Sequence, residues 1–155
     1  MKATRTIPIL ALLVLAGTFA AVAPANPASH ASLTIHHQLR GCHSWSLNGG
    51  AFGTSKSVTL RHGGSVTVTN NDVMPHKLIE SSGPAVLYTR VSRGGSMGMH
   101  GTYPPAMLAR MGAATSITFS KPGVYRFTTK AGEDYMSGVK TTGEDNVLRL
   151  TVRVS

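Results

Sequence analysis

Apolar and polar residues alternate with a period of two along several short stretches of the chain. This period is typical of β-strands that have one buried and one solvent-facing side. Turn residues, chiefly Gly, Asn and Pro, separate the stretches. The period is found at 33–39, continued in the same phase at 45–47, and at 57–60, 65–70, 77–79, 116–119, 124–127 and 147–154. The sequence therefore predicts an all-β chain, an antiparallel β-sandwich of about seven strands.

The inward-facing positions of this pattern should form the core of the sandwich. The expected core residues are Trp45, Val66, Val68, Phe119, Tyr125, Phe127, Leu148, Leu150 and Val152.

Residues 81–112 interrupt the strand pattern with a long irregular segment rich in Gly, Pro and Met. The only regular structure expected there is a short strand at 86–88 and one helical turn over 105–110. Long irregular loops inside a compact domain are usually functional or disordered. This one contains Met97, Met99 and His100, whose thioether and imidazole groups suit Cu(I). Methionines also fill irregular gaps in loops, so plain packing is the alternative interpretation.

The N-terminus has the layout of a secretory signal peptide. Lys2 and Arg5 precede an uncharged, mostly apolar run at 7–22, and small residues follow it. A membrane anchor is disfavoured because the run is short and no stop-transfer cluster follows. We therefore expect an exported protein, in the periplasm, at the cell surface or secreted. Residues 1–31 form its signal peptide and flexible N-terminus, and residues 32–155 form a single domain.

Charge and composition narrow the possible partners. The chain has 15 Lys and Arg against 6 Asp and Glu. Loss of Lys2 and Arg5 with the signal leaves 13 basic side chains against 6 acidic ones, a net charge of +7. This balance favours an acidic partner protein or an anionic surface. The basic residues form no stripe interleaved with aromatics, so nucleic acid is not an expected partner. We expect a monomer, and no catalytic nucleophile or phosphate-loop motif points to an enzyme.

Two segments carry a resemblance to a known family. Residues 63–76 read GGSVTVTNNDVMPH, and residues 119–127 read FSKPGVYRF. Both resemble the cupredoxin superfamily, in which a strand leads through N-x-D to a His and a P-G-x-Y-x-F strand leads to a second ligand loop. The resemblance implies a Greek-key β-sandwich that binds a copper ion, with His76 as the first copper ligand.

The second ligand loop departs from the cupredoxin pattern. The family places a Cys, then a His and often a Met after the P-G-x-Y-x-F strand. Here Thr129 occupies the Cys position, and Glu133 falls near the His position. Met136 remains as a ligand of the expected type. A blue copper site needs a thiolate and two imidazoles with a weak axial ligand, so this loop does not supply the full set.

The adjacent pair Cys42-His43 offers the missing donors. Cys42 is the only cysteine of the chain. His43 shares the phase of Trp45 and should point inward, whereas Cys42 points outward unless a bulge at Gly41 turns it. We therefore predict a copper site of Cys42, His43 and His76. Its fourth ligand is Met136 or Glu133. The alternative is a buried thiol beside a hydrogen-bonded histidine.

Three functions are compatible with this sequence. The first is that of a copper-binding cupredoxin-like protein that transfers one electron to an acidic redox partner protein. Copper storage, copper delivery as a chaperone, or copper resistance is the second. A metal-free β-sandwich that acts as a binding module is the third.

Overall fold

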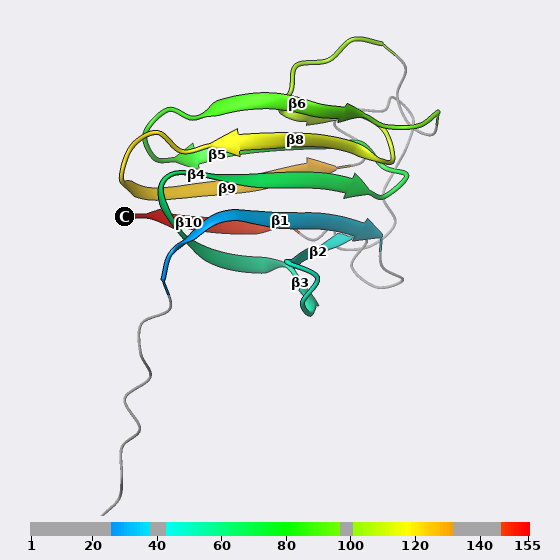
Figure 1. Cartoon of the computed structure of the whole chain (residues 1–155). Helices are drawn as coiled ribbons and strands as arrows, with labels where there is room; N and C mark the ends of the chain where they lie inside the picture. The colour runs from blue at the N-terminus through cyan, green and yellow to red at the C-terminus, as the bar shows by residue number, and fades with distance from the viewer. Residues whose placement is uncertain (1–25, 38–42, 97–100, 132–146) are drawn as a thin grey trace, which may run out of the picture.

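The computed structural model describes residues 26–37, 43–96, 101–131 and 147–155, and every regular element among them is a β-strand (Figure 1). The ten strands are β1 (Ala28–His37), β2 (His43–Leu47), β3 (Phe52–Gly53), β4 (Ser55–Asn71), β5 (His76–Ser82), β6 (Leu87–Arg93), β7 (Met107–Leu108), β8 (Ala113–Thr118), β9 (Gly123–Ala131) and β10 (Arg149–Val154). This part of the chain contains no helix that could cross a membrane. The predicted all-β class is confirmed. The proposed signal peptide lies outside the described residues, and β1 already begins at Ala28, before the expected domain boundary at residue 32.

Strand β4 belongs to both layers of the sandwich. Its first half, 55–60, pairs with β10, and its second half, 65–71, pairs with β1, while 65–69 also pairs with β8. One sheet thus has the order β3-β2-β1-β4-β8-β6, and the other has the order β4-β10-β9-β5-β7. Figure 1 shows β6, β8, β4 and β1 as the front layer, with β5, β9 and β10 behind it.

The change of sheet occurs at the Gly63-Gly64 step. Gly63 has a φ of +73°, and a Cβ on Gly64 would lie 2.8 Å from the Arg61 carbonyl oxygen. Glycine is therefore required here by both backbone conformation and close packing. The sequence predicts two strands separated by a turn at this point, but the chain bends without reversing and stays one strand.

Two strand pairings are parallel, β1 with β4 and β10 with β4. All other pairings are antiparallel. The first and last strands of the described chain both run alongside β4, although neither is its neighbour in the sequence. Alternation of apolar residues reports which face of a strand is buried, not its direction, so the sequence pattern did not indicate these parallel pairs.

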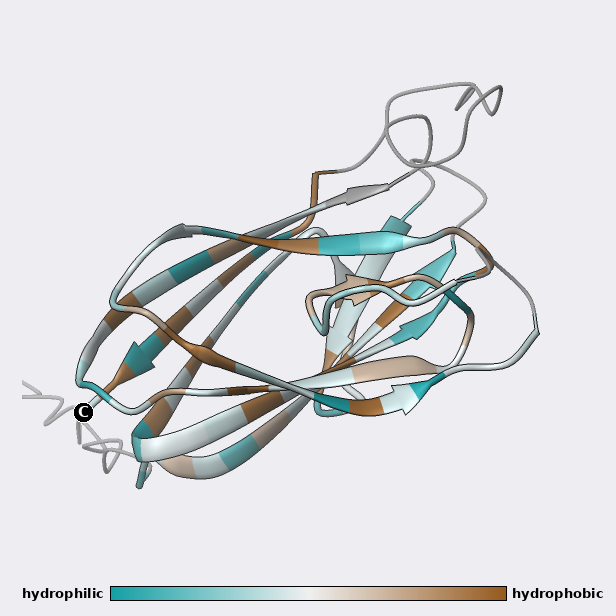
Figure 2. Ribbon diagram, turned by 90° about the horizontal axis from the view of Figure 1, so that it is seen from above, coloured by the Kyte–Doolittle hydropathy of each residue, from teal (hydrophilic) through white to brown (hydrophobic). Residues whose placement is uncertain are grey.

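Every residue expected in the core is buried. Each of the nine has no more than 1% of its surface exposed. Phe119 contacts Tyr125 and Phe127 edge to face, with ring centroids 4.8 and 6.1 Å apart. The Tyr125 hydroxyl donates to the carbonyl of Lys121 at 2.6 Å. Figure 2 shows the hydrophobic and hydrophilic residues alternating along the strands, as the period-two pattern requires.

The segment 81–112 is more regular than its sequence indicates. It contains the seven-residue strand β6, which pairs with β8. The helical turn expected over 105–110 is wrong, because Met107 and Leu108 form β7 and pair with β5. Strand β6 was underestimated because it lies at the edge of its sheet and leaves Leu87 and Val91 exposed.

We expect Phe127→Ala to lower the free energy of unfolding by about 3 kcal/mol or more, because it leaves a cavity among buried rings. Urea unfolding followed by tryptophan fluorescence measures this loss. Val124→Ala, on the same strand but 37% exposed, is the matched control and should cost less than about 1 kcal/mol. Similar losses in the two variants would contradict the assigned core.

Candidate metal centre

Four side chains of types that can bind a metal meet at one end of the sandwich, because their strands begin or end there. His37 is the last residue of β1, and His43 is the first residue of β2. These two are direct partners in the antiparallel β1–β2 pairing. His76 is the first residue of β5, and Asp72 follows β4 immediately. The cluster therefore draws on both sheets.

The rings of His43 and His76 lie against each other in the interior. Both residues are at most 1% exposed. Their ring centroids are 4.7 Å apart with the planes at 89°. One carboxylate oxygen, Asp72 Oδ2, lies 2.8 Å from His43 Nδ1 and 3.2 Å from His76 Nε2. A single buried carboxylate thus accepts hydrogen bonds from one histidine of each sheet.

Asn70 and the backbone fix this carboxylate in place. The Asp72 amide donates to Asn70 Oδ1 at 2.9 Å, and Asp72 Oδ1 accepts from the Met74 amide at 3.0 Å. The Asn70 side-chain amide donates to the Met74 carbonyl at 2.8 Å, and also to the carbonyls of Leu108 and Arg110 at 3.2 and 3.3 Å. These hydrogen bonds therefore tie the loop between β4 and β5 to Asn70 and, through Asn70, to the backbone of residues 108 and 110.

His37 extends the cluster toward solvent. Its side chain is 54% exposed, and its Nδ1 lies 3.7 Å from Asp72 Oδ1. One ligand atom each from His37, His43 and Asp72 lie within 4.8 Å of one another. Imidazole nitrogens with a carboxylate oxygen are donors that suit Cu(II) and Zn(II). The described cluster therefore has the composition of a transition-metal site.

The surroundings of Asp72 favour its charged form. Burial alone would raise the pKa of this carboxyl. The hydrogen bonds from His43 and His76, with that from the Met74 amide, outweigh burial and hold the pKa well below its usual value. Asp72 is therefore ionised at neutral pH, where a carboxylate orients a histidine or binds a cation.

The structure brings together His43 and His76, two of the five predicted ligands. Cys42, Glu133 and Met136 lie outside the described residues, as do the Met97, Met99 and His100 of the long loop. Strand β9, which leads toward Glu133, ends at Ala131 directly opposite His76. The copper site proposed from the sequence thus stays a prediction.

Neither Asp72 nor His37 was placed in the site from the sequence. Asp72 belongs to the N-x-D motif and stands four residues before His76. That spacing is a signal for a carboxylate beside the ligand. His37 ends the strand whose neighbour starts with His43, which only the strand pairing reveals.

No protein-family model and no curated protein matches the sequence. Among solved structures, the chain is similar to amicyanin from Paracoccus versutus, with 19% identity, 87% of each chain covered and a TM-score of 0.39. It is also similar to a multi-copper oxidase from Pediococcus acidilactici, with 14% identity, 81% of this chain and 25% of the oxidase covered, and a TM-score of 0.41.

These likenesses are too weak to place the chain in a family, and the fold stands as the all-β sandwich described above. Identities and TM-scores this low say nothing about the metal or the partner of this chain. The histidine and aspartate cluster is therefore the feature of this chain that bears on its function.

We expect Asp72→Asn to lower the free energy of unfolding at pH 7 by about 2 kcal/mol, because hydrogen bonds to a charged acceptor are lost. The folded-state pKa of Asp72 is depressed. The stabilisation is therefore present above the unfolded-state pKa, about 4, and is lost as the pH falls through the lower folded-state pKa. Urea unfolding of both proteins at pH 7 and pH 3 should show the difference shrinking at pH 3.

Glu80→Gln is the control for this measurement. Burial raises the pKa of the Glu80 carboxyl, so its charged form does not stabilise the fold and its replacement should cost nothing at pH 7. A loss for Asp72→Asn that is as large at pH 3 as at pH 7 would contradict the assigned role of the carboxylate.

Proposed function

We propose that this chain is an exported copper-binding protein in which His43 and His76 hold a copper ion. One observation carries the proposal: two buried histidines from different sheets lie ring to ring and share one carboxylate oxygen. Buried polar side chains are costly unless they are hydrogen-bonded or bind a metal. Imidazole and carboxylate groups gathered at one buried point are also the donors that a transition metal uses.

Asp72 would act as the orienting carboxylate of this site. Metal-binding histidines commonly donate their second ring nitrogen to a carboxylate, which fixes the ring and makes it a better ligand. Asp72 contacts Nδ1 of His43 and Nε2 of His76. The ligand atoms would then be His43 Nε2 and His76 Nδ1. The proposal retains Cys42, which precedes His43 in the chain, as the thiolate donor, and Met136 or Glu133 as the fourth ligand.

A copper ion with these donors would make the protein a one-electron carrier rather than an enzyme. Copper bound by thiolate and imidazole cycles between two oxidation states. Rigid strand ends support this role, since His43 and His76 each begin a strand. The basic balance of the chain, 15 Lys and Arg against 6 Asp and Glu, favours an acidic redox partner protein.

A second function, copper storage or resistance, is favoured by a different observation. His37, His43 and Asp72 offer a nitrogen and oxygen donor set without any thiolate. Such donors hold Cu(II) but give no intense charge-transfer band. The absorption spectrum therefore distinguishes this function from electron transfer.

The test is copper loading of the purified full chain, followed by metal analysis and an absorption spectrum. We expect one copper per chain and an intense visible band. His76→Gln should weaken copper binding by more than about a hundredfold, because loss of an orienting carboxylate alone costs roughly 10- to 100-fold. Circular dichroism verifies that the variant folds. His62→Gln is the matched control, because His62 is exposed and bonds the Ser120 carbonyl.

Two outcomes separate the possibilities. A wild-type chain with one copper but no visible band, unchanged in Cys42→Ser, indicates storage or resistance instead of electron transfer. Equal copper affinity in wild type and His76→Gln would overturn the assigned site.

A further inference from the structure

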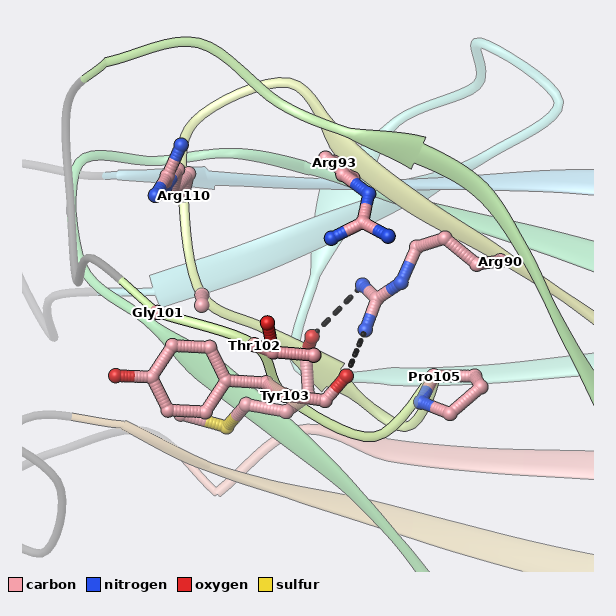
Figure 3. Close-up of a pocket in the computed structure, with 9 residues that line it drawn as sticks. Arg90, Arg93, Gly101, Thr102, Tyr103, Pro105 and Arg110 are labelled. Atoms are coloured by element: carbon pink, nitrogen blue, oxygen red, sulfur yellow. Dashed lines mark hydrogen bonds between the residues drawn. The ribbon is translucent and has the colours of Figure 1, made fainter.

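A cavity of about 280 Å³ opens between strands β6 and β7 and the segment 101–105 (Figure 3). Three of its lining residues are arginines. The cavity is lined by Arg90, Arg93, Gly101, Thr102, Tyr103, Pro105, Met107, Ala109 and Arg110. None of these residues belongs to the candidate metal centre, so the cavity is a separate site.

Arg90 is fixed in this cavity by backbone carbonyls. Its guanidinium donates to the carbonyl of Met107 at 2.8 Å, to that of Tyr103 at 3.3 Å and to that of Pro104 at 2.5 Å. These acceptors orient the group but carry no charge. The bonds therefore position a full positive charge at the cavity without neutralising it.

A β-bulge brings Arg93 to the same side. In a regular strand, residues three apart point to opposite faces. The register of β6 against β8 shifts between Arg90 and Ser92, which leaves Val91 as the extra residue. A bulge of this kind redirects the side chains that follow it and is frequent beside functional sites. Figure 3 shows the Arg90 and Arg93 side chains pointing toward each other.

Neither guanidinium group has a carboxylate partner in the described part of the chain. Burial, and then the charge of Arg93, lower the pKa of Arg90. Like charges held close together destabilise a fold. An anion between them would remove this repulsion.

We propose that this cavity binds a small oxoanion, a phosphate or carboxylate group of a small molecule. Planar guanidinium groups match the geometry of such anions through paired hydrogen bonds. A concave site of this volume suits a small ligand, whereas an acidic protein surface would need a flatter patch. Arg110 also lines the cavity and adds a third cationic side chain.

The cavity is also connected to the candidate metal centre through the backbone. Met107 lines the cavity, and its neighbour Leu108 pairs with His76. The Asn70 amide donates to the carbonyls of Leu108 and Arg110. Anion binding does not depend on the metal, however, so the metal-free chain is sufficient to test it.

The test is a titration of the metal-free full chain with inorganic phosphate at low ionic strength. Isothermal titration calorimetry measures the binding, and backbone NMR shifts locate it. We expect saturable one-to-one binding, with shifts concentrated at β6 and residues 101–110. Arg93→Gln should weaken binding by about tenfold, the effect of losing a charge-assisted hydrogen bond. Arg93 is exposed, so the variant should fold normally.

Arg153→Gln is the matched control, because it removes the same charge from an exposed position on β10. Its effect should stay below about twofold, since distant surface charges are screened. Equal weakening in both variants would show a general charge effect and overturn the proposal. A glutamate peptide that binds where phosphate does not would also overturn it, by assigning the arginines to a protein partner.

Discussion

A carboxylate buried at one end of the sandwich is the group on which the arrangement of the candidate metal centre depends. An ionised carboxylate removed from water destabilises a fold unless hydrogen bonds or opposite charges compensate it. Asp72 receives these bonds from His43, His76 and the Met74 amide. Since the two histidines begin strands in different sheets, the carboxylate connects the two layers through polar contacts where the apolar core ends.

Strand β4 is what places this carboxylate. The strand bends at Gly64, passes from one sheet to the other and ends at Asn71, so that Asp72 emerges between the layers. Asn70, the last buried residue of β4, reaches the carbonyls of Leu108 and Arg110. The same side chain thus bonds Met74, whose amide donates to Asp72, and Arg110, which lines the cavity. Fold, candidate metal centre and cavity share one buried amide.

The sequence predicted those features that depend on local periodicity. Burial of Phe127 and the inward direction of His43 follow from the alternation along a strand. Features that depend on which strands pair were not accessible: alternation does not encode the parallel direction of β1 and β10, and the edge strand β6 presents Leu87 to solvent. The contact between Asp72 and His43 was inaccessible for the same reason, because it joins residues 29 positions apart.

The most direct test of the account is a crystal structure of the copper-loaded chain with anomalous scattering measured at the copper edge. The account predicts one strong peak within about 2.0–2.3 Å of a ring nitrogen of both His43 and His76, the range of metal–nitrogen and metal–sulfur bonds. Asp72 should remain hydrogen-bonded to both rings. A copper ion bound elsewhere, or copper-loaded crystals without an anomalous peak between these two histidines, would contradict it.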